Sequence, residues 1–221
     1  MSSEDTFVLE EFKNSINMVE GRYEVSLPWE LIKKQLPTNL ALSRKRLNST
    51  IHKLKQTNKY LEIHDQIIKE QLSLSFTETV AEEDHKLTNV HYLPHFPVIK
   101  DSTTTPIRIV FNACARMDKQ APSHLTDLFL KFRLDPFAIS ADISKAFLRV
   151  GLQPRDRDYT RFIWLKDLNN EKDLQAYRFR SVLFGATCSP FLLQLTLQHH
   201  FETYPTSPEV SFLMTKFMWT T

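Results

Sequence analysis

The chain has 221 residues, of which 42% are hydrophobic and 24% are charged, and these values are ordinary for a folded, water-soluble protein. Its 16 Phe can build a core, and its net charge of +2 is too small for a wholesale cationic binder. The 3 Gly exclude the glycine-rich loops of dinucleotide-binding and Walker-type proteins, and the 2 Cys exclude a disulfide framework.

The sequence shows neither a membrane-spanning segment nor a secretory signal. No window approaches the roughly 18 uninterrupted apolar residues of a membrane-spanning helix. Residues 1–5 are acidic and polar, unlike a secretory signal. We therefore expect a cytoplasmic or nuclear protein that is not secreted and does not bind a membrane.

The N-terminal part, residues 1–80, is predicted to hold a strand and a long basic helix. Tyr23, Val25 and Leu27 alternate with polar residues, which predicts a strand over 21–29. Apolar residues at helical spacing, without Gly or Pro, predict one helix over 39–74. Its first half carries six cations and no acid: Arg44, Lys45, Arg46, Lys53, Lys55 and Lys59.

These cations allow two interpretations. They form either a solvated helix face or a strip that faces nucleic-acid phosphates, since clustered Lys and Arg attract nucleic acid without reading its sequence. For the second interpretation the candidate nucleic-acid-binding residues are Arg44, Lys45, Lys53 and Lys55.

Strands dominate the next part of the chain. We expect strands over 90–99 and 107–111, joined by a hairpin tip at 101–105, and then a short helix over 121–134. A strand over 137–143 follows, with an apolar continuation at 146–152. Alternating segments at 160–165 and 175–180 predict a hairpin. A helix over 191–200 follows Pro190, which suits a first helical position.

The most informative segment is Ala-Asp-Ile-Ser-Lys-Ala-Phe at 141–147. Alone, an Asp at a strand end is more often a turn or cap residue than a catalytic one. Here a hairpin, Phe-Gly at 184–185, and Ser-Pro at 189–190 follow in order. This ordered set resembles the reverse transcriptase part of BEL/Pao-type retrotransposon polyproteins. The resemblance runs from about residue 12 to residue 216 and rests on motifs at 21–29, 92–98, 108–115, 141–147 and 182–190.

The resemblance implies a role for each matching residue. Phe147 matches the aromatic under the nucleotide sugar, where a bulky ring excludes a 2′-hydroxyl; plain core packing is its other interpretation. Arg108 matches the arginine over the triphosphate, where a planar cation stabilises negative charge. Phe184 and Gly185 match the residues beneath the incoming nucleotide. Asn112 stands where the family commonly has Asp, a modest departure.

The same resemblance implies Mg²⁺, because nucleotidyl transfer uses two divalent ions that carboxylates and phosphates bind. Asp142 matches one catalytic, metal-binding Asp, and the carbonyl of Ile143 would be a second oxygen ligand. The spacing of His91 and His95 is also typical of a metal site, but Pro94 between them argues against zinc.

The third motif of the family is an aromatic residue followed by Val-Asp-Asp, which supplies the other two carboxylates. At 218–221 this chain has Met-Trp-Thr-Thr. Codons for Tyr-Val-Asp-Asp, read one nucleotide later, can give Met-Trp-Thr-Thr, which suggests a frame slip between Phe217 and Met218. The other interpretation is an unrelated hydrophobic tail. With one carboxylate left, we expect impaired metal binding and no primer extension.

We therefore expect an α+β chain with the fingers and incomplete palm of a right-handed polymerase over 81–217, and an out-of-family tail at 218–221. Its partners would be an RNA or DNA primer–template and deoxynucleotides, and the remaining polyprotein parts would be absent. The leading hypothesis is a degenerate RNA-directed DNA polymerase. A non-catalytic nucleic-acid-binding remnant and a translated relic without a cellular role are the alternatives.

Overall fold

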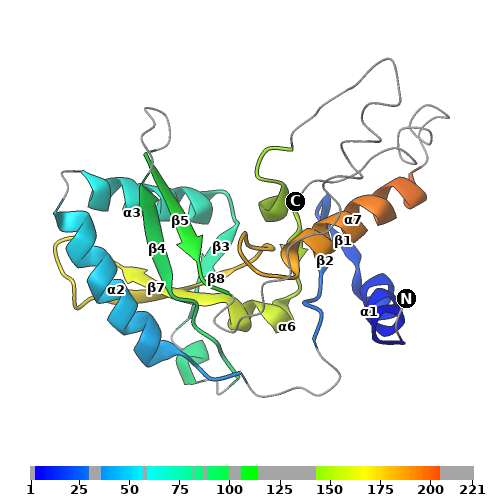
Figure 1. Ribbon diagram of the computed structural model, residues 1–221, viewed down its shortest axis with the longest axis horizontal. Coiled ribbons are helices and arrows are strands. Elements are labelled where there is room, and N and C mark those ends of the chain that lie inside the picture. The colour runs from blue at the N-terminus through cyan, green and yellow to red at the C-terminus, as the bar shows by residue number, and fades with distance from the viewer. Residues whose placement is uncertain are drawn as a thin grey trace, which may run out of the picture.

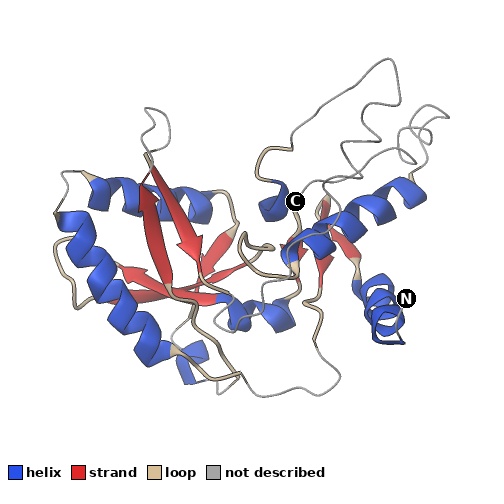
Figure 2. Cartoon of the chain, viewed as in Figure 1, coloured by secondary structure: helices blue, strands red, loops and turns tan. Residues whose placement is uncertain are grey.

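The computed structural model describes residues 3–29, 36–56, 59–81, 83–86, 89–99, 106–113 and 143–204, with the backbone alone at 3–6 and 85–86. Helices and strands are mixed along the chain, as an α+β fold requires (Figures 1 and 2). The predicted hairpin tip at 101–105, helix at 121–134 and tail at 218–221 lie outside these residues, as does nearly all of the strand at 137–143.

The larger of two cores lies under three strands and two helices. β3 (Thr77–Thr79), β8 (Leu174–Phe179) and β7 (Arg161–Leu165) form an antiparallel sheet in that order. β7 is buried along its whole length because apolar groups pack on it, and Phe162 and Trp164 are both 0% exposed. The hairpin of β4 (His95–Ile99) and β5 (Ile107–Phe111) packs beside it, on the left in Figure 1.

Two helices cover this core, where the sequence predicted one over 39–74. α2 (Leu40–Lys55) and α3 (Tyr60–Ser73) are separated near Lys59, whose φ of 70° places it in the left-handed region. The single long helix is therefore wrong, although no Gly or Pro interrupts it. The predicted apolar face is confirmed, because Leu47, Ile51 and Leu54 of α2 are all nearly inaccessible in the larger core.

The smaller core joins both ends of the described chain. α1 (Ser3–Ser15), which the sequence did not predict, leads into the hairpin of β1 (Asn17–Val19) and β2 (Arg22–Val25). β2 then pairs in parallel with β6 (Gly151–Leu152). Val25 and Leu152, partners in this register, are both 0% exposed. α7 (Ser189–Thr203) packs on the same core through Leu192 (Figure 1).

Most other predicted elements are found with small changes. The strand at 107–111 and the hairpin at 160–180 are confirmed as β5 and as β7 with β8, and the helix after Pro190 as α7. The expected strands over 21–29 and 90–99 shorten to β2 and β4. The apolar segment 146–152 is divided into a one-turn helix, α5 (Ala146–Arg149), and β6. The division of the chain at residue 80 stays a prediction.

Among the described helices, none has both the length and the apolar character that crossing a bilayer requires.

Candidate functional site

Two side chains from distant parts of the sequence, Arg108 and Phe147, meet the exposed ring of Phe184. On β5 the inward residues Ile107 and Phe111 are buried, so the alternate position, Arg108, faces solvent. Its guanidinium carbon lies 5.6 Å from the centroid of the Phe184 ring. The ring of Phe147, on α5, lies 5.6 Å from the same centroid at an interplanar angle of 61°. Phe184 is nevertheless 60% exposed, so this group presents an aromatic and cationic surface to solvent.

Gly185 lets the chain pass close to β5. Its φ of +102° is a conformation that residues with a Cβ rarely adopt, and a Cβ at this position would lie 2.9 Å from the carbonyl oxygen of Phe111. The backbone next to Phe184 is therefore seated against the end of β5, on the strand that also carries Arg108. Of the residues predicted to bind the nucleotide, the structure brings together Arg108, Phe147, Phe184 and Gly185.

The start of α7 anchors the segment that carries Phe184. The hydroxyl of Ser189, 1% exposed, donates to the carbonyl oxygen of Leu183 at 2.6 Å, and its N–H donates to that of Ala186 at 3.1 Å. Pro190 follows in the first turn, where its missing N–H has no helical partner to lose. The Ser-Pro pair thus fixes the turn between Phe184 and the helix.

The predicted metal ligands are only partly visible. Asp142 lies outside the described residues. The side chain of Ile143 is 43% exposed, and its carbonyl oxygen accepts a hydrogen bond from the Ala146 N–H at 3.1 Å, which leaves one lone pair. No group of three or more His, Cys, Asp or Glu within the described ranges is placed to hold a metal ion.

His91 and His95 do not converge on a common point. The Nδ1 atom of His91 pairs with the carbonyl oxygen of Pro37 at 2.7 Å, and Nε2 of His95 pairs with that of Ile163 at 3.0 Å. Their metal-like spacing therefore reflects two separate backbone contacts.

The predicted nucleic-acid-binding cations lie on α2. Arg44, Lys45 and Lys53 are exposed. Lys55 is also exposed, but its ammonium pairs with the carboxylate of Glu171, between β7 and β8. Lys55 is therefore less available to a phosphate than the other three.

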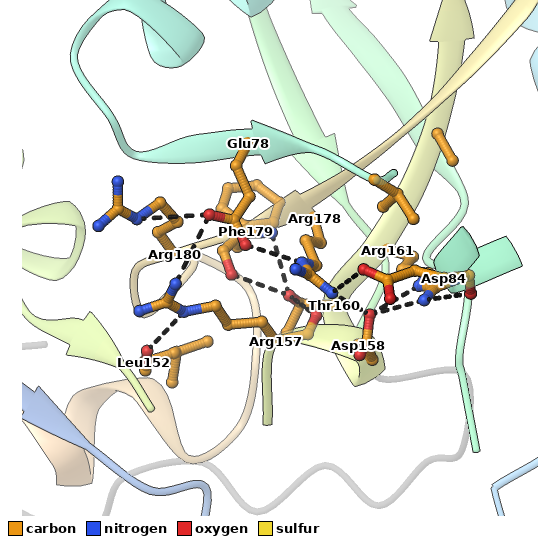
Figure 3. A network of polar contacts seen from close by, with 12 residues as sticks. Glu78, Asp84, Leu152, Arg157, Asp158, Thr160, Arg161, Arg178, Phe179 and Arg180 are labelled. Atoms are coloured by element: carbon orange, nitrogen blue, oxygen red, sulfur yellow. Dashed lines mark hydrogen bonds and ion pairs between the residues drawn. The ribbon is translucent and has the colours of Figure 1, made fainter. Parts of the chain in front are cut away.

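Sequence reasoning missed a network of arginines and acids between β3, β8 and the short helices α6 (Pro154–Arg157) and η2 (Asp158–Thr160) (Figure 3). Glu78 accepts from Arg178 at 2.7 Å and lies 3.5 Å from Arg157. Asp158 contacts Arg161 and Arg178, each at 2.8 Å. Its members are Glu24, Glu78, Asp84, Arg157, Asp158, Arg161, Arg178 and Arg180.

The strand register explains why this network exists. Arg161 and Arg178 are direct partners across β7 and β8, and like charges in such positions repel. Burial lowers the pKa of Arg178, but the hydrogen bonds and the charge attraction of Asp158 and Glu78 together outweigh burial and hold that pKa above its usual value. The network is thus structural. The predicted hairpin placed both arginines, but nothing in the sequence identified the acids that bridge them.

Comparison with known protein families matches residues 40–218 to the family described as Reverse transcriptase (RNA-dependent DNA polymerase). The chain belongs to the reverse transcriptase family. A search of curated proteins finds no match. The reverse transcriptase match includes the whole group around Phe184 and also Asp142, whereas α1, β1 and β2 precede it. Members of this family bind a nucleic-acid template and nucleotides and generally use divalent metal ions.

Proposed function

We propose that the chain is a retroelement-derived reverse transcriptase domain of BEL/Pao type whose nucleotide pocket is built around Phe184. The observation that carries this proposal is the convergence of Arg108, Phe147 and Phe184 within ring-contact distances, with Gly185 seated against β5. The resemblance assigned all four to the nucleotide from motifs far apart in sequence. Their meeting at one exposed surface supports that assignment.

Each residue then has a chemical task. Arg108 is a permanent planar cation on a solvent-facing strand position, suited to the triphosphate of a deoxynucleotide. Phe147 sits under the sugar and excludes a 2′-hydroxyl. Phe184 and Gly185 form the floor beneath the nucleotide. In this assignment the β4–β5 and β7–β8 hairpins belong to the fingers, and α5 and α7 belong to the palm.

We further propose that this chain does not extend a primer. A two-ion site needs several anionic oxygens, and the residues of this sequence that match the family's metal ligands, Asp142 and the Ile143 carbonyl, do not fit two ions. Where the family's aromatic-Val-Asp-Asp motif is expected, residues 218–221 are Met-Trp-Thr-Thr. We therefore assign no step through a metal ion. A one-nucleotide frame slip before Met218 remains our explanation, and the codons of 218–221 test it directly.

Two measurements on the whole chain test the proposal. Binding of a fluorescent deoxynucleotide in the presence of primer–template should weaken about tenfold or more in Arg108→Ala, because a charge-assisted contact is lost. Arg155→Ala, which removes an exposed arginine of α6, is the matched control. Equal affinity of the Arg108→Ala and wild-type chains would rule out the pocket. Template-dependent synthesis with Mg²⁺ and deoxynucleotides would rule out inactivity.

The exposed cations of α2 favour a second candidate function, a non-catalytic nucleic-acid-binding remnant. Its signature is binding to primer–template that weakens steeply with salt. Replacing Arg44, Lys45 or Lys53 by Ala should each lower the slope of log affinity against log salt by about 1, as expected for a lost phosphate contact. The control variant Lys13→Ala, on α1, should leave the slope unchanged. A salt-independent affinity would argue against this function.

A further inference from the structure

The helix that carries Phe147 is too short to hold its own shape. α5 has four residues, and one hydrogen-bonded turn is an unfavourable nucleus in isolation. Its last carbonyl oxygens have no partner within the helix. The position of the Phe147 ring against Phe184 must therefore be fixed by contacts from outside α5.

Arg22, on β2, supplies such contacts at the C-terminal end of α5. Its Nη2 donates to the carbonyl oxygen of Leu148 at 2.6 Å and reaches that of Val150 at 3.5 Å, and its Nε donates to that of Arg149 at 3.1 Å. One guanidinium thus covers three consecutive carbonyls, which the planar fork of arginine permits and a lysine ammonium does not. A cation is also the favourable charge at a helix C-terminus.

Lys145 supports the other end of α5, and Phe76 lies next to both cations. Lys145 directly precedes the helix at a φ of 55°, and its ammonium lies 2.6 Å from a carboxylate oxygen of Glu70, on α3. The Arg22 guanidinium and the Lys145 ammonium each lie 5.8 Å from the centroid of the Phe76 ring, which is 6% exposed. A buried aromatic face favours nearby cations. α5 is therefore held at both ends, at the place where the two cores meet.

We propose that Arg22 is a positioning residue that keeps the Phe147 ring against Phe184 by binding the carbonyls that end α5. The proposal rests on the proposed function, in which Phe147 lies under the nucleotide sugar. Arg22 precedes the matched region at 40–218, so the functional unit of this reverse transcriptase extends upstream of the family match to include β2.

Fluorine NMR on the whole chain tests this placement. A single 4-fluorophenylalanine at position 147 reports the ring current of Phe184, and Phe184→Leu provides the reference shift without that ring. In Arg22→Ala the fluorine signal should move toward this reference. Arg22→Lys keeps the charge and most of the stem, so it gives a folded variant if Arg22→Ala does not fold, and its signal should move in the same direction. The guanidinium of Arg155 contacts Ser26 in the segment after β2, so Arg155→Ala removes a neighbouring arginine and should leave the fluorine signal in place.

The outcomes separate this proposal from the proposed function. A fluorine signal unchanged in Arg22→Lys, or moved equally in Arg155→Ala, would overturn the positioning role. The same variants are then tested for their preference for a fluorescent deoxynucleotide over its ribonucleotide counterpart. This preference should fall in each variant in which the fluorine signal moves toward the reference. A moved signal with an unchanged preference would uphold the positioning of Phe147 and contradict its proposed place under the sugar.

Discussion

Gly185 and Gly21 form a matched pair, because both have positive φ and only one lies against another part of the chain. Gly185 has a φ of +102° and the Phe111 carbonyl oxygen 2.9 Å from the position of a Cβ. Gly21 has a φ of +75°, and no described atom lies within 4 Å of its Cβ position. A residue with a Cβ at position 185 would therefore have both backbone strain and a steric clash, whereas one at position 21 would have backbone strain alone.

We expect Gly185→Ala to lower the free energy of unfolding by at least ~2 kcal/mol, because strain and clash add. Gly21→Ala should cost about 1 kcal/mol, the left-handed strain of a residue with a Cβ. Urea unfolding of the two variants gives both values. If Gly185→Ala costs no more than Gly21→Ala, the close approach of this turn to β5 is wrong.

A pair of uncharged histidines lies in the larger core. His64 stacks on Trp164 at 4.2 Å between ring centroids and lies 5.4 Å from His95, and both imidazoles are almost inaccessible. Burial, and then the neighbouring His95, lower the pKa of His64 to about 2. Burial lowers the pKa of His95 to about 4, although its hydrogen bond to Ile163 acts in the opposite direction. The carboxylate of Asp65, the residue after His64, accepts a hydrogen bond from Trp164 Nε1 and pairs with Lys69.

This pair should make stability fall in acid. In the unfolded chain both histidines take up protons near pH 6.5, whereas the folded chain does so only near pH 4 and pH 2. Their contribution is therefore complete above pH 6.5, falls progressively below it, and is fully lost once the pH drops below the folded pKa values. Between pH 7.5 and 5, wild type should lose roughly 2 kcal/mol more than His64→Phe.

Urea unfolding at the two pH values provides the measurement. The control is His52→Gln, which removes an exposed histidine of α2 and should retain the wild-type loss. An identical pH dependence in wild type and His64→Phe would mean that His64 is not buried in the neutral form.

At the scale of elements, the break between α2 and α3 offers a test with opposite signs. Lys59 has a φ of 70°, which costs a residue with a Cβ about 1–2 kcal/mol. Lys59→Gly should therefore stabilise the chain by about 0.5–1 kcal/mol after the entropy of glycine in the unfolded state is counted. Lys53→Gly, at an exposed position inside α2, should destabilise by about 1 kcal/mol. Calorimetry that finds both variants destabilised would argue for a continuous helix.

The sequence predicted elements where a periodic pattern dominates and failed where tertiary contacts decide. β5, β7 and β8 are short segments rich in β-branched and aromatic residues, and they were found almost to the residue. The break at Lys59 was not visible, because a lysine in the left-handed region carries no compositional signal. In the sequence Arg161 looks like a surface residue, but it is 0% exposed, because its guanidinium pairs with the Asp158 carboxylate and donates to the backbone carbonyl of Asp84.

The candidate site follows the same rule. Arg108, Phe147, Phe184 and Gly185 were identified by their motifs, but their meeting depends on how β5, α5 and the turn before α7 pack. Arg22 could not be found in this way, because its partners are backbone carbonyls and any sequence supplies those. Motifs thus select the candidate site residues, whereas a residue such as Arg22, which contacts only backbone carbonyls there, becomes visible only in three dimensions.

At the scale of the whole molecule, the segment before the family match is part of the folded unit. Val25 is 0% exposed in the smaller core, whereas Val19, on the edge strand β1, is 42% exposed. Val25→Ala should cost about 2 kcal/mol through lost burial and a cavity, and Val19→Ala less than about 0.5 kcal/mol. Equal costs in thermal unfolding would mean that residues 3–29 do not pack on β6 and α7.

The pairing of β2 with β6 also sets the order of events as the chain is made. The hydrogen-bond partner of the Ser26 hydroxyl, Gln153, is synthesised 127 residues later, and Leu152, the strand partner of Val25, directly precedes it. At roughly 5–20 residues per second on the ribosome, that interval lasts about 6–25 s. Throughout it Phe12, Ile16 and Val25 have no finished core to enter. Ribosome-associated chaperones should therefore bind the segment that contains Phe12, Ile16 and Val25 and release it only once β6 has emerged.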